Sequence, residues 1–156
     1  MNVGIIVHSH TGNTLCVAQH LKEALSSAGH AVSIQSVSAL NDEEPDVRKI
    51  RLHEMPDIGI YEVLLFGAPV RGFSLSSVMQ AYLAGIRSLD GKKTACFVTQ
   101  FFPYAWMGGQ RALGQMCDIC KNKNASLYGT GIINWSKAKA RKKQIKAMAE
   151  RFCTFG

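Results

Sequence analysis

Short apolar segments alternate with amphipathic segments along the whole chain. Five runs are rich in strand-forming residues, and most of them are apolar throughout, which is typical of parallel strands buried on both faces. Four longer stretches repeat apolar residues three or four positions apart, the spacing of a helix that buries one side. The expected strands are 2–8, 31–37, 63–66, 95–98 and 127–133, and the expected helices are 13–28, 75–89, 106–121 and 137–152.

This alternation predicts an α/β protein with a doubly wound, five-stranded parallel sheet and helices on both of its faces. The segment 38–60 is the exception. It holds six of the eleven acidic residues and shows no helical spacing, so we predict no regular element there.

The composition fits one domain over residues 1–156, because 47% of the residues are hydrophobic and the mean hydropathy is +0.01. No apolar run approaches the roughly 18 residues that a membrane span requires. The first residues carry no basic segment of the kind that begins a signal peptide. We therefore expect a cytoplasmic protein without a membrane span.

Charge is distributed unevenly along the chain. Residues 1–90 carry a net charge of −3 and residues 91–156 a net charge of +10. A basic half can bind nucleic acid, an anionic membrane or an acidic protein. The most basic stretch, 137–146, belongs to an amphipathic helix, which favours a solvated outer face or a docking surface for an acidic partner. We do not expect nucleic-acid binding.

The loop after the first strand carries the first candidate site. In doubly wound sheets, ligands bind beyond the carboxyl ends of the strands. Backbone N–H groups and the partial positive charge at a helix N-terminus make such a loop suited to an anion. An alternative is that Ser9 or Thr11 simply caps the helix. The candidates are Ser9, His10, Thr11, Gly12, Asn13 and Thr14.

The pattern S-x-T-G-x-T in this loop, with Ala18 and Leu21 further down the helix, resembles the phosphate loop of the flavodoxin family. Val7 departs from the family's usual aromatic residue, and His10 replaces a common threonine. The resemblance implies the strand order 2-1-3-4-5 and FMN as the cofactor, with its phosphate at residues 9–14. A phosphate dianion would favour protonated His10, although a solvated loop histidine is an equal alternative.

Two later loops extend the resemblance. Residues 67–74 are similar to the flavodoxin segment beside the flavin ring, and residues 99–109 hold four of the thirteen aromatic residues. Aromatic rings at a ligand edge favour a stacking platform, or else they cover the edge of the sheet. The candidates that the resemblance implies are Pro69, Val70, Arg71, Gly72, Phe73, Thr99, Gln100, Phe101, Phe102, Tyr104, Trp106 and Gly108.

Arg71 is the one cation among these candidates. A cation near the ring would favour an anionic reduced flavin by about 1–4 kcal/mol. We therefore expect a less negative reduction potential than that of the acidic flavodoxins. The alternative is an exposed arginine that pairs with water or with the phosphate.

The five cysteines and five histidines predict no metal site, because neither set has the spacing of a ligand cluster. Cys117 and Cys120 form a lone C-x-x-C well inside an expected helix, which favours reduced, packed thiols. We expect no catalytic residue either. The interpretation that best fits the loops is an FMN-binding carrier of electrons between redox proteins, with an acidic partner.

Two alternatives stay open. One is an NAD(P)H-dependent FMN or quinone reductase of the same fold, since Pro69-Val70-Arg71 and Gly108-Gly109-Gln110 are similar to short quinone-reductase loops. The other is a basic interaction module that binds no flavin.

Overall fold

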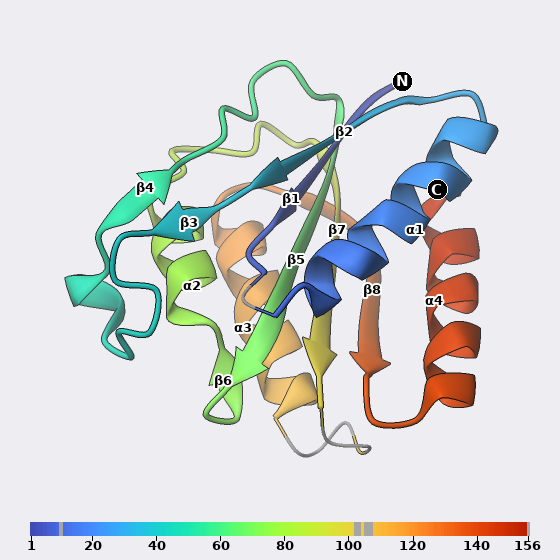
Figure 1. The fold of residues 1–156 in the computed structure, drawn as a ribbon. Coiled ribbons are helices and arrows are strands. Elements are labelled where there is room, and N and C mark those ends of the chain that lie inside the picture. The colour runs from blue at the N-terminus through green and yellow to red at the C-terminus, as the bar shows by residue number, and fades with distance from the viewer. Residues whose placement is uncertain (10, 102–103, 105–107, 156) are drawn as a thin grey trace.

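The computed structural model describes residues 1–9, 11–101, 104 and 108–155, and its centre is a sheet of parallel strands (Figure 1). The strands are β1 (Asn2–Val7), β2 (Ala31–Ser36), β5 (Val63–Arg71), β7 (Lys93–Gln100) and β8 (Ser126–Asn134). The helices are α1 (Asn13–Ser27), α2 (Ser77–Ala84), α3 (Gly109–Asn122) and α4 (Ala138–Phe152).

The strand order is β2-β1-β5-β7-β8, and neighbours in this order are parallel. The predicted five-stranded sheet and its order 2-1-3-4-5 are therefore confirmed. Strand β5 is longer than predicted, because residues 67–69 still pair with β7 and the last two, Val70 and Arg71, pair antiparallel with a short strand β6 (Ser74–Leu75). This hairpin extends the central strand into the loop that the sequence assigned to a ligand.

Helices α1 and α4 cover one face of the sheet, and α2 and α3 cover the other (Figure 1). Successive side chains of a strand point to opposite faces. Ile5 accordingly packs with α1 and α4, whereas its neighbour Ile6 packs with α2 and α3. Both are fully buried, which explains why the central strands are apolar throughout.

The segment 38–60 contains two short strands, β3 (Ser38–Ala39) and β4 (Leu52–Glu54), and a 3-10 helix, η1 (Val47–Lys49). Half-buried apolar side chains of this segment pack against the α2 side of the core. The Tyr82 hydroxyl of α2 donates to the carbonyl of Pro56 at 2.6 Å, and burial raises the pKa of Tyr82 to about 12. The segment thus covers the core with an irregular strap instead of an α-helix.

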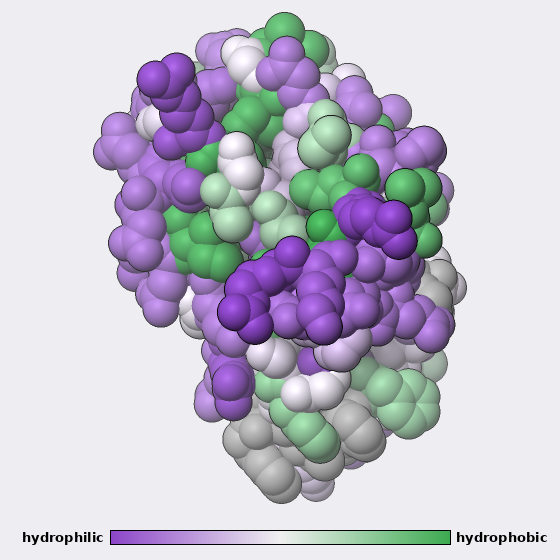
Figure 2. All heavy atoms as spheres, turned by 90° about the vertical axis from the view of Figure 1, so that its left-hand side faces the viewer, coloured by the Kyte–Doolittle hydropathy of each residue, from purple (hydrophilic) through white to green (hydrophobic). Residues whose placement is uncertain are grey.

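Figure 2 shows the face on which this strap lies, where apolar groups are interrupted by hydrophilic ones. Leu40, Met55 and Ile60 of the strap are more than half exposed. Exposed apolar residues scattered singly are normal for a protein surface.

Three of the five cysteines lie inside the protein core. Cys96, Cys117 and Cys120 are buried, with Cys96 Sγ 3.9 Å from Cys120 Sγ. Within the described ranges, no group of three or more His, Cys, Asp or Glu side chains is arranged to hold a metal ion. No helix in the described part of the chain is both long and apolar enough to cross a bilayer.

Candidate functional site

The three loops that the sequence singled out meet at the carboxyl ends of β1, β5 and β7. Residues from all three line one cleft of about 290 Å³. Larger hollows lie between α1 and α4 and beside the end of α2, but neither is lined by residues of these three loops. The residues that line the cleft are Thr11, Asn13, Pro69, Val70, Arg71, Thr99, Gln100 and Phe101.

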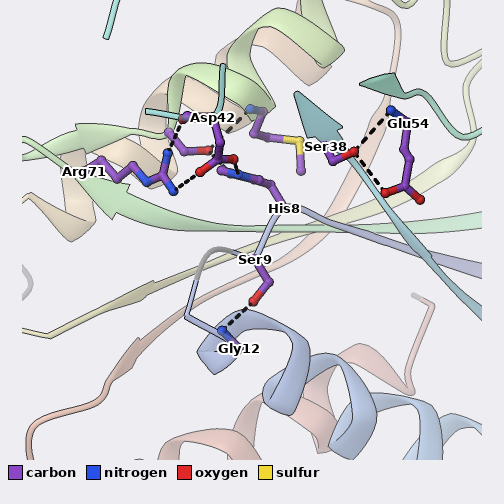
Figure 3. Close-up of polar contacts among 9 residues, drawn as sticks. His8, Ser9, Gly12, Ser38, Asp42, Glu54 and Arg71 are labelled. Carbon is purple, nitrogen blue, oxygen red and sulfur yellow. Dashed lines mark hydrogen bonds and ion pairs between the residues drawn. The ribbon is translucent and has the colours of Figure 1, made fainter. Parts of the chain in front are cut away.

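The first loop turns sharply into α1. Gly12 has a φ of 91°, a left-handed conformation that favours glycine. The Ser9 hydroxyl accepts hydrogen bonds from the backbone N–H of Gly12 at 3.1 Å (Figure 3) and from that of Leu15 at 3.3 Å. The residue at the N-cap position is Gly12, and Ser9 braces the first turn of α1 from three residues upstream. The first turn of α1 has no acidic residue, so its N-terminus stays attractive to an anion.

Thr14 joins the first loop to the third. Its buried hydroxyl lies 2.9 Å from the Thr99 hydroxyl at the end of β7. This contact fixes the start of α1 against the end of β7 and so holds the first loop beside the third.

The second loop is the β5–β6 hairpin, whose turn consists of Gly72 and Phe73. Both have a positive φ, 57° and 60°. Phe73 is 56% exposed, two residues after Arg71 of the cleft lining. Gly108 of the third loop packs directly behind this turn, because a Cβ added to Gly108 would lie 2.7 Å from Phe73 Cα.

The third loop is anchored by Gln100. Its side-chain amide donates to the Tyr104 carbonyl at 2.7 Å and to Asn134 Oδ1 at 2.6 Å. Phe101 and Tyr104 are 69% and 54% exposed. The predicted site residues His10, Phe102 and Trp106 lie outside the described residues.

Solved structures with the same architecture cover nearly the whole chain. Two-electron reduced flavodoxin from Megasphaera elsdenii is 23% identical with a TM-score of 0.70 over 97% of this chain and 98% of that one. Flavodoxin 2 from Bacillus cereus is 19% identical with a TM-score of 0.68 over 97% of each chain. A WrbA-like flavodoxin from Agrobacterium tumefaciens is 12% identical with a TM-score of 0.69 over 96% and 95%. The chain has the flavodoxin-like fold. No protein-family model and no curated protein matches the sequence.

Arg71 of the second loop lines the cleft and is paired with a carboxylate. Its guanidinium donates to the Asp42 carboxylate and to the Asp42 backbone carbonyl, each at 2.8 Å. Asp42 comes from the strap, where no element was predicted. Arg71 is therefore neither an isolated cation nor a solvated side chain, because a carboxylate offsets its charge at the cleft.

His8 is a residue of this site that sequence reasoning missed. It follows the last residue of β1 and is 1% exposed, with Nδ1 2.9 Å from the Ser76 hydroxyl and Nε2 2.6 Å from Asp42 Oδ1 (Figure 3). The sequence could have indicated His8, because a titratable residue there ends an apolar run and precedes a candidate ligand loop. Nothing in the sequence around Asp42 indicates that it is the partner of His8.

Acid stability should depend on Asp42. Burial raises the pKa of this carboxyl, but hydrogen bonds from Arg71 and His8 outweigh burial and lower the pKa from 3.8 to about 2. A lowered pKa in the folded state adds stability above pH 4 that is lost as the pH falls through about 2. In urea unfolding, wild type should exceed Asp42→Asn in stability at pH 5, and the two should converge near pH 2. An equal difference at both pH values would contradict this.

Proposed function

We propose that this protein binds FMN in the cleft and carries electrons between redox proteins. The observation that supports this most is that three loops with flavodoxin-like sequences line one cleft at the carboxyl ends of β1, β5 and β7. The cleft is near the lower limit of small-molecule sites, roughly 300–1,000 Å³, so a bound mononucleotide would stay partly exposed.

The chain offers neutral donors for the phosphate and apolar side chains for the ring. The helix N-terminus at residues 11–14, with the hydroxyls of Ser9 and Thr11 close by, would hold the phosphate without a lysine. The ring would lie between the 69–73 hairpin and the loop from Thr99 to Gly108. Bound FMN supplies one- and two-electron transfer, and the protein contributes its position and the charge around it.

The partner would dock on the groove between α1 and α4, which has a volume of about 440 Å³. Three of the residues that line the groove are basic: Arg141, Lys142 and Lys146. The Arg141 guanidinium stacks 4.4 Å from the centre of the Trp135 ring. The Trp135 backbone N–H donates to the Gln100 carbonyl at 2.7 Å, so a residue that lines the groove is hydrogen-bonded to a residue that lines the cleft. Charge complementarity favours an acidic redox protein as the occupant.

A reductase that takes electrons from NAD(P)H is the second candidate, supported by the likeness to the WrbA-like structure. One experiment separates the candidates. Purified protein is mixed with FMN, and its visible spectrum is recorded before and after NADPH or NADH is added without air. Binding without bleaching supports the carrier, rapid bleaching supports the reductase, and no binding supports an interaction module without flavin.

Electron transfer should depend on the charge of the groove more than on net charge. Lys146→Glu places an acid in the groove, whereas Lys121→Glu makes the same charge change at an exposed position on α3, on the other face of the sheet. We expect a severalfold slower second-order reduction by a dithionite-reduced acidic ferredoxin for Lys146→Glu alone. The difference should shrink in 0.5 M salt, because screening shortens the reach of charges to roughly 3–10 Å. Equal rates for both variants would argue against this docking surface.

A further inference from the structure

Four residues from four parts of the chain form one hydrogen-bonded row beside the cleft. Ser76 is the N-cap residue of α2, and His8 directly follows the last residue of β1. Asp42 comes from the strap, and Arg71 is the last residue of β5. The contacts run from Ser76 Oγ to His8 Nδ1 at 2.9 Å, from His8 Nε2 to Asp42 Oδ1 at 2.6 Å, and from Asp42 Oδ2 to the Arg71 guanidinium at 2.8 Å (Figure 3). We call this row the His8 unit. Its last member, Arg71, lines the cleft.

The charge of the His8 unit is set by one proton. Asp42 is ionised above the acid range and Arg71 is always protonated, so these two charges cancel. The unit is neutral when His8 is neutral and carries one positive charge when His8 is protonated. Arg71 by itself therefore adds little net charge to the cleft.

Both protonation states of His8 fit the same heavy-atom positions. Neutral His8 donates from Nε2 to Asp42 and accepts at Nδ1 from the Ser76 hydroxyl. Protonated His8 donates from both nitrogens, because the Ser76 oxygen can also accept. Asp42 is 28% exposed and connects the buried imidazole to solvent. His8 can thus gain or lose a proton while the hydrogen bonds of the unit stay in place.

Among the described residues, the strands and the helix turn beside the His8 unit carry few ionisable groups. Strands β2 and β5, which flank the end of β1, contain no ionisable residue apart from Arg71. The first turn of α2 has no acidic residue. Glu43 and Glu44 of the strap line a second hollow together with Arg71, at the guanidinium end of the unit. A negative charge that arrives in the cleft is therefore felt by His8 mainly through Arg71 and Asp42.

We propose that His8 is the charge-balancing residue of this site, positioned by Asp42, and that it takes up a proton when a flavin in the cleft is reduced. The proposal rests on the proposed binding of FMN. Bound FMN would take up two electrons from the reduced partner protein and one proton from water, which would leave its ring with one negative charge. A second proton from water goes to the His8 imidazole, and both protons return to solvent when an acceptor removes the electrons.

The test is the number of protons taken up per two electrons, obtained from the midpoint potential against pH. FMN binding is measured first by quenching of flavin fluorescence. The variants are His8→Gln, Asp42→Asn and the control His53→Gln, an exposed histidine of β4. Imidazole NMR of the wild type, free and with oxidised or reduced FMN, gives the pH at which His8 is half-protonated.

We expect the half-protonation pH of His8 to rise on reduction, and proton uptake to fall from two per electron pair in wild type and His53→Gln to one in His8→Gln. Asp42→Asn should lower the half-protonation pH in every state, because His8 loses its carboxylate. Failure of FMN to bind would overturn both this inference and the proposed function. Tight binding with an unmoved His8 titration, or with unchanged proton uptake in His8→Gln, would overturn this inference alone. If His8→Gln does not fold, the titration of His8 in the wild-type protein is the deciding measurement.

Discussion

Replacement of Gly67 by alanine should lower the free energy of unfolding by about 3 kcal/mol, because overpacking a tight core typically costs 1–3 kcal/mol and the added carbon has nowhere to go. Gly67 lies in the central strand β5, opposite Phe97 of β7. A Cβ at Gly67 would lie 2.1 Å from Phe97 Cζ, and Phe97 is fully buried. The ring also packs near Phe152 of α4, with 6.5 Å between centroids, so it has little room to turn away.

Gly114→Ala is the matched control for this prediction. Gly114 is an exposed position inside α3 where an added Cβ meets nothing within 4 Å. Alanine there should raise stability by about 0.5–1 kcal/mol, because it lowers the entropy of the unfolded chain. Thermal unfolding should show a melting temperature lower by roughly 6–12 °C for Gly67→Ala. Equal stability of Gly67→Ala and wild type would show that the core around Phe97 is looser than its contacts indicate.

Gly108→Ala should weaken FMN binding at least tenfold, a loss of about 1.4 kcal/mol. Gly108 has a φ of 106°, and its missing side chain lets the third loop pack against the Phe73 turn of the second. A methyl group 2.7 Å from Phe73 Cα would push apart the two loops between which we place the ring. Fluorescence titration of the FMN-free protein measures the effect.

Gly91→Ala separates this effect from backbone strain. Gly91 also has a positive φ, 72°, but an added Cβ there has no neighbour within 4 Å. It precedes β7, whereas the cleft lies beyond the other end of that strand. Both variants should lose some stability, yet Gly91→Ala should bind FMN as wild type does. Similar losses of affinity in both would mean that strain, and not the loop contact, determines binding.

The sheet could be predicted from the sequence because its central strands are buried on both faces. Ile5 and Ile6 belong to different sides of the core, and only such a strand has no polar face. The strap could not be predicted for the opposite reason. Ile50 and Ile58 cover the core from irregular backbone, and Leu52 does so from a strand of only three residues, so the spacing of these residues has neither the helical nor the strand period.

The loops of the site could be predicted from the sequence because a sharp turn into a helix needs particular residues, such as Gly12, at fixed spacing. The His8 unit could not be predicted from the sequence. His8 and Asp42 are 34 positions apart, and their contact depends on how the strap folds back over the sheet. A hydrogen bond between segments without periodicity leaves no pattern in one sequence, so only the three-dimensional arrangement shows it.

The strap and α4 lie on opposite sides of the sheet (Figure 1), and this has a consequence for how the protein meets other molecules. The strap holds six acids and three bases, whereas α4 holds six bases and one acid. The molecule therefore carries unlike net charges on these two segments, −3 on the strap and +5 on α4. The field of an approaching acidic protein exerts a torque on it that turns α4 forward before the surfaces touch, which enlarges the fraction of collisions that begin in a productive orientation.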